Sequence, residues 1–160
     1  TSHRERTERD REVLREQLDA NPANTPLLPD AHAAIDALEH GRQIDVSRFH
    51  PALQTLFSPG LQDFLIDAFS RDPARLIAGL ALPVLIVQGD NDLQVGVADA
   101  QRLAAARPAA ELVILPGMNH VLKQAPAGDV PANLASYADP EMPLAPGLAE
   151  AVAGFILRER

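Results

Sequence analysis

The chain has 160 residues, a length typical of one domain, and its 22 acidic and 14 basic residues give a formal net charge of −8. This acidic balance argues against a nucleic-acid partner, and it supplies no polybasic patch for a membrane surface. Cysteine is absent, which excludes disulfides and thiolate chemistry, and no run of ~20 apolar residues or signal-peptide pattern occurs, so we expect a cytoplasmic protein.

The first half of the chain predicts a series of short helices and carries no strand signal. A helix of mixed charge over residues 4–19 ends at Asn21-Pro22. Three further helices follow: one over residues 31–39 that Asp30 caps and Gly41 ends, one that starts at Asp45 or Ser47 with Pro51 in its first turn, and one that Asp72-Pro73 opens and that runs through Leu80.

Between the last two of these helices, apolar residues recur at helical spacing after Pro59-Gly60. The pattern predicts an amphipathic helix. Its apolar stripe either lines a pocket for an acyl group or is the ordinary buried face of a helix; the stripe consists of Leu61, Phe64, Leu65 and Phe69.

The second half of the chain predicts a β-α-β unit followed by a loop and a last helix. Two short apolar runs, residues 84–87 and 112–115, are typical of buried parallel strands, and a helix over 97–107 connects them. The last helix covers 146–157. Because two parallel strands do not make a self-sufficient sheet, we expect the remaining strands in a partner or in another part of the gene product.

Both predicted strands end in a glycine that is followed, three residues later, by a titratable side chain. The first ends in Gly89-Asp90-Asn91-Asp92 and the second in Gly117-Met118-Asn119-His120. Because ligand chemistry in α/β folds sits at the carboxyl ends of strands, Asp92 and His120 are predicted to meet at one edge. A carboxylate that binds one nitrogen of an imidazole fixes its tautomer and stabilises its charged form, as a general base requires.

Simpler interpretations of these residues exist. An aspartate such as Asp92 also occurs in ordinary turns at the ends of strands, and a lone histidine such as His120 is commonly a surface residue. Asp90 is the competing carboxylate, and we interpret it as a solvated loop residue. A metal site made of Asp90, Asp92 and His120 lacks the tight spacing of metal ligands, so the acid–base interpretation is preferred.

The two motifs resemble the C-terminal half of the α/β-hydrolase family, in particular bacterial serine-aminopeptidase-like hydrolases. The resemblance covers most of residues 11–157 and is carried by Val-Leu-Ile-Val-Gln-Gly-Asp-Asn-Asp-Leu-Gln-Val and Leu-Pro-Gly-Met-Asn-His. In that family the acid follows the seventh strand and the histidine follows the eighth. It implies that Asp92 and His120 belong to a Ser-His-Asp triad. It also implies that residues 80–160 are the C-terminal part of the hydrolase core, with two parallel strands, and that residues 11–79 are an all-helical cap.

The chain departs from the family in one respect, because no Gly-x-Ser-x-Gly motif occurs in it. Residues 1–10 match no part of the family pattern and stay unassigned. None of the five serines lies at a predicted strand-to-helix turn; they are Ser2, Ser47, Ser58, Ser70 and Ser136. The nucleophile, the oxyanion donors and the other strands are therefore expected outside this sequence, and the chain alone is expected to be inactive.

Two functions follow. The resemblance implies a serine hydrolase that cleaves an ester or amide of a small apolar substrate and needs no cofactor or metal. Its implied protein partner is either the missing N-terminal half of the fold or a second copy with which the chain associates. The missing nucleophile motivates the alternative, a non-catalytic fragment or stand-alone module that binds a partner through its sheet edge or its helical part.

Overall fold

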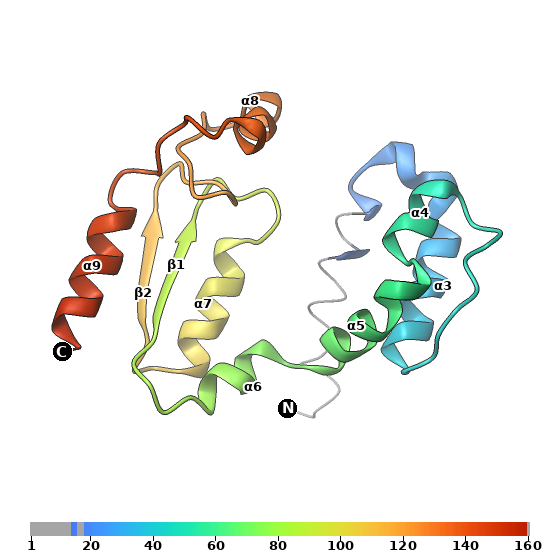
Figure 1. Cartoon of the computed structure of the whole chain (residues 1–160), viewed down its shortest axis with the longest axis horizontal. Coiled ribbons are helices and arrows are strands. Elements are labelled where there is room, and N and C mark those ends of the chain that lie inside the picture. The colour runs from blue at the N-terminus through green and yellow to red at the C-terminus, as the bar shows by residue number, and fades with distance from the viewer. Residues whose placement is uncertain (1–13, 16–17, 160) are drawn as a thin grey trace. The chain divides into compact units, whose positions relative to one another are not determined.

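The computed structural model describes residues 14–15 and 18–159, which form two compact units with their boundary between Asp72 and Pro73 (Figure 1). The predicted extension over residues 1–10 and most of the predicted helix over 4–19 lie outside the described residues. Residues 14–15 and 18–19 of that helix are helical. The assignment of 11–79 as a cap and 80–160 as hydrolase core stays a prediction.

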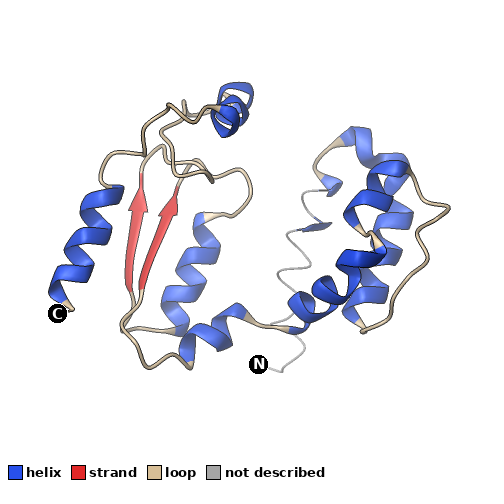
Figure 2. Ribbon diagram, in the orientation of Figure 1, coloured by secondary structure: helices blue, strands red, loops and turns tan. Residues whose placement is uncertain are grey.

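In its described part, the first unit consists of short helices joined by turns (Figure 2). Prolines open these helices, because the fixed φ of proline suits the first turn and its missing N–H leaves no donor unpaired there. In chain order they are the 3-10 helix η1 (Pro22–Leu27) and the α-helices α3 (Leu28–Glu39), α4 (Pro51–Leu56) and α5 (Pro59–Ser70).

Aliphatic side chains and one phenylalanine make the core of the first unit. Phe57, Ile35 and Leu38 are fully buried there, and Ala31, Ala34, Val46 and Leu53 join them. The buried Gln62 fastens the loop before α4 to α5: its Oε1 accepts from Ile44 N at 2.9 Å, and its Nε2 donates to the carbonyls of Ile44 and Phe57, each at 2.9 Å. This pairing satisfies an amide that would otherwise be costly to bury.

Two predicted helix starts in the first unit are wrong. Helix α3 begins at Leu28, because η1 runs into it without a break, so Asp30 lies in the first turn and does not cap the helix. Helix α4 begins at Pro51, where the His50 ring accepts from Ala52 N, while Asp45 accepts from Ser47 N in a local turn. The predicted end at Gly41 is confirmed by its left-handed φ of 69°.

The apolar stripe of α5 is divided between the core and the surface. Leu65 and Phe69 pack against the core, whereas Leu61 is 45% and Phe64 67% exposed. The buried-face interpretation therefore holds for two of the four residues.

The second unit is mixed α/β, as predicted at that level, and its sheet holds two parallel strands (Figure 1). Strand β1 (Leu85–Gly89) pairs with β2 (Glu111–Leu115) with Leu85 opposite Glu111 and Gly89 opposite Leu115. Helix α6 (Pro73–Ala78) precedes the sheet, α7 (Val97–Ala106) connects the strands, and α9 (Leu148–Arg158) ends the unit. Among the described residues, no helix has the length and apolar character needed to cross a membrane.

The segment after β2 contains two elements that the sequence pattern did not predict. Helix α8 (Val130–Ala135) and the 3-10 helix η2 (Ser136–Ala138) lie in what we expected to be a loop. They are short, and their start signal is local: the Asp129 side chain accepts from Ala132 N at 2.9 Å. Helix α9 starts at Leu148 and not at 146, because Gly147 before it is left-handed, with φ 85°.

Candidate active site

The loops that leave β1 and β2 touch each other directly at the carboxyl ends of the strands. A Cβ placed on Gly89 would lie 1.9 Å from the carbonyl oxygen of Met118, so only glycine permits this approach. Asn91 N donates to the same oxygen at 3.1 Å, and Asp90 Oδ1 accepts from Gly117 N at 2.6 Å. Asp90 is thus a connector between the two loops and not merely a solvated residue.

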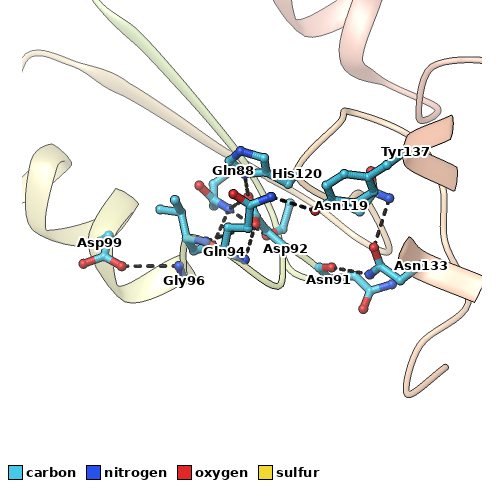
Figure 3. Close-up of polar contacts among 12 residues, drawn as sticks. Gln88, Asn91, Asp92, Gln94, Gly96, Asp99, Asn119, His120, Asn133 and Tyr137 are labelled. Atoms are coloured by element: carbon cyan, nitrogen blue, oxygen red, sulfur yellow. Dashed lines mark hydrogen bonds and ion pairs between the residues drawn. The ribbon is translucent and has the colours of Figure 1, made fainter. Parts of the chain in front are cut away.

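Asp92 and His120 meet at this edge, as the strand order predicted (Figure 3). Asp92 Oδ2 lies 3.1 Å from His120 Nδ1. The Asp92 side chain is only 8% exposed, whereas that of His120 is 38% exposed. The acid is therefore enclosed, and the imidazole that it holds is open to solvent.

Three groups besides His120 donate to the Asp92 carboxylate. Gln94 N and Val95 N reach Oδ1 at 2.8 and 3.0 Å, and Gln88 Nε2 reaches Oδ2 at 3.2 Å. Burial on its own would raise the pKa of Asp92, but the hydrogen bonds from these groups and from His120 outweigh it and lower the pKa below its usual value. Asp92 is therefore ionised at neutral pH and can only accept.

The ionised acid determines which nitrogen of His120 holds the proton. Because Asp92 Oδ2 can only accept, His120 Nδ1 must donate, and the neutral ring leaves Nε2 with a free lone pair. The Tyr137 ring stacks beside His120, with ring centres 6.5 Å apart and planes 16° apart. Tyr137 Oη accepts from Gln94 Nε2 at 3.2 Å (Figure 3). The turn that contains Asp92 therefore also binds the Tyr137 side chain.

A buried amide network, which sequence reasoning missed, holds the backbone next to His120. Asn119 and Asn133 are each 1% exposed. Asn119 Nδ2 donates to Asn133 Oδ1 at 3.1 Å and to Ser136 Oγ at 2.6 Å, and its Oδ1 accepts from Lys123 N at 3.0 Å. Asn133 Nδ2 in turn donates to Asn91 O at 2.8 Å. No spacing rule indicated these contacts, because three of the four hydrogen bonds involve a residue of α8 or η2.

The second unit offers no serine hydroxyl to His120. Ser136 is the one serine in the sequence of residues 73–160, and it is buried. Its hydroxyl donates to Asn133 O at 2.7 Å and accepts from Asn119, so it is engaged away from the imidazole. Of the other serines, Ser58 lies directly before α5, and the described part of the chain has no strand before that helix. Ser2 lies outside the described residues.

The candidate site shows no cluster of metal ligands. Across the described residues, three or more His, Asp or Glu side chains nowhere gather closely enough to hold a metal ion. Asp90 accepts a hydrogen bond from Gly117 N, whereas Asp92 binds His120, so the two carboxylates do not share a partner. The side chains brought together here are thus an acid–imidazole pair.

Comparison with known proteins identifies no relative: no family model, no curated protein and no solved structure matches the chain. The interpretation of the site depends on its own geometry and on the two motifs at the strand ends.

Asp92 makes the stability of the fold depend on pH. Because the pKa of Asp92 is lowered in the folded state, its contribution to stability is present above the unfolded pKa and is lost as pH falls through the folded pKa. We expect the free energy of unfolding to decrease below about pH 4, and to decrease less steeply in the Asp92→Asn variant. Urea denaturation of the wild-type chain and of Asp92→Asn between acidic and neutral pH measures this. If the free energy of unfolding fell with pH equally steeply in both, the expectation would be contradicted.

Proposed function

We propose that this chain is the acid-and-base part of a serine hydrolase of the α/β-hydrolase type, which cleaves an ester or amide of a small apolar substrate. The observation that carries the proposal is the 3.1 Å contact between Asp92 Oδ2 and His120 Nδ1 at the carboxyl ends of adjacent parallel strands. The half-exposed imidazole has its second nitrogen available, as a general base needs.

The reaction begins with a serine hydroxyl supplied by polypeptide outside the second unit. His120 Nε2 takes the hydroxyl proton while the serine oxygen attacks the substrate carbonyl, and the imidazolium then returns the proton to the leaving alcohol or amine. A water molecule hydrolyses the resulting acyl-enzyme by the same route, which regenerates the serine. Asp92 keeps its negative charge throughout and stabilises the charged imidazolium. The helical first unit takes the part of a cap in this proposal.

The test uses a protein expressed from the full upstream reading frame and a fluorophosphonate probe, which reacts with activated serines. We expect His120→Ala to slow labelling about 10²–10⁴-fold, because the serine loses its base. The matched control is His32→Ala, since His32 pairs with Asp19 on the surface of the first unit. Labelling that continues unchanged in His120→Ala contradicts the role of His120, and labelling lost in His32→Ala shows that the assay reports folding.

A second candidate, a non-catalytic partner-binding module, is favoured by one observation on the second unit. Within the described residues each strand pairs on one side only, and large apolar side chains of the same unit are exposed, such as Leu82 at 72%. Such an edge invites pairing with another chain. The genomic sequence before Thr1 separates the two candidates. A strand followed by Gly-x-Ser-x-Gly supports the hydrolase, and a start codon with a ribosome site directly before the codon of Thr1 supports the module.

A further inference from the structure

Gln88, the penultimate residue of β1, places its side-chain amide among three oxygen atoms. Its Nε2 lies 3.0 Å from Gly89 O, 3.0 Å from Val95 O and 3.2 Å from Asp92 Oδ2. All three atoms are acceptors, so only the NH₂ end of the carboxamide suits this position, and its two hydrogens are shared among the three oxygens. Gln88 therefore links the last residue of the strand to the far end of the turn that holds Asp92.

The hydrogen bonds to Asp92 give Gln88 a specific task. A carboxylate has about four acceptor positions, and here two are used by the backbone amides of Gln94 and Val95 on Oδ1. On Oδ2 the two donors are Gln88 Nε2 and His120 Nδ1. The backbone amides hold one oxygen, and Gln88 is the donor that binds the other oxygen beside His120.

We infer that Gln88 is a positioning residue for His120 that acts through Asp92: its carboxamide joins Oδ2 to both ends of the 89–95 turn and so directs this oxygen at His120 Nδ1. Gln88 makes no hydrogen bond to the imidazole, and in the proposed mechanism it does not touch the substrate. The inference rests on the proposed function for its purpose, but its physical content is the position of a proton on His120, which is measurable without any enzymatic activity.

The variant that tests it is Gln88→Met in the full 160-residue chain, because methionine keeps the length of the side chain and removes the donor. The readout is the ratio of the two neutral His120 tautomers, taken from imidazole ¹⁵N chemical shifts in alkaline buffer, where the ring is uncharged. We expect the ratio of the Nδ1–H form to the Nε2–H form to fall about fivefold, the effect of losing a hydrogen bond of ordinary net strength. A folded Gln88→Met chain with the wild-type ratio overturns the inference.

The matched control is Gln101→Met, because Gln101 is an exposed residue of α7. It is expected to leave the tautomer ratio unchanged, and a change equal to that of Gln88→Met would overturn the inference by showing a general effect. A measurement on the wild-type chain decides the case if Gln88→Met does not fold. Hydrogen exchange of the Gln88 carboxamide should be at least about tenfold slower than that of Gln101, and equal rates would exclude the three contacts.

Failure of this inference and failure of the proposed function give different results. An absence of fluorophosphonate labelling with a shifted tautomer ratio in Gln88→Met removes the hydrolase and keeps the positioning role. Labelling that depends on His120, together with an unchanged ratio, keeps the hydrolase and removes the role of Gln88.

Discussion

The Asp92→Asn variant of the assembled enzyme is expected to hydrolyse its substrate about 10³–10⁴-fold more slowly than wild type. The two backbone amides on Oδ1 require the carbonyl oxygen of the new asparagine to face them. Its NH₂ group then replaces Oδ2 beside His120 and donates to Nδ1. The neutral imidazole must carry its proton on Nε2, so it cannot accept the proton of the serine.

Steady-state kinetics with a chromogenic ester, together with the ¹⁵N shifts of His120, checks this expectation. The matched control is Asp90→Asn, which removes the neighbouring carboxylate of the same turn while an amide oxygen can still accept from Gly117 N. We expect this control to retain most of the activity and the wild-type tautomer. If Asp92→Asn worked at the wild-type rate, Asp92 would be a turn residue and not part of a triad.

In the second unit, the Gly89→Ala variant is expected to lose more stability than any other variant that adds a single methyl group to a glycine. The added Cβ would lie 1.9 Å from Met118 O and 2.5 Å from Met118 C, which are backbone atoms that cannot move aside alone. The loop from Gly117 to His120 must shift, and the hydrogen bond from Asn91 N to Met118 O is strained with it. We expect a loss of about 3 kcal/mol in the free energy of unfolding.

Urea denaturation measures this loss, and the tautomer of His120 reports whether its contact with Asp92 survives in the folded fraction. Gly154→Ala is the matched control, because its Cβ would meet only the end of the flexible Arg158 side chain, at 3.4 Å. In the middle of α9 alanine is the better helix former, so the control should gain up to about 1 kcal/mol. Equal stabilities of the two variants would show that the strand ends are not closely apposed.

Much of the second unit was predictable because its signals are local. Short β-branched runs between turn residues indicated β1 and β2 to within one residue of their starts, and Pro108 correctly predicted that α7 would end just before it. Helix α8 escaped prediction because six residues that include a proline carry no periodicity that separates a helix from a loop. The start of α3 was wrong for a related reason, since no local signal marks where a 3-10 helix becomes an α-helix.

The candidate site likewise contains residues that were predictable from the sequence and residues that were not. Asp92 and His120 were predictable, because two equivalent turns follow two parallel strands, and parallel strands present their carboxyl ends at the same edge. Gln88 contacts residues no more than seven positions away, but no pattern indicates where its side chain points. The contacts of Asn119 were not predictable either, because its partners come from segments whose distance in space no spacing rule determines. Asn119 meets Ser136 across 17 positions, and Asn133 meets Asn91 across 42.

The α/β order of the second unit, the helical character of the first, and the acid and imidazole that follow the two strands can all be inferred from local patterns in the sequence. The orientation of the Asp92 carboxylate, the burial of the Asn119 amide and the close approach of Gly89 to Met118 become apparent only in the folded chain. This difference arises because strand and helix propensities act over a few neighbouring residues. The hydrogen bonds of a buried polar group are satisfied instead by whichever donors and acceptors the folded chain brings within about 3 Å.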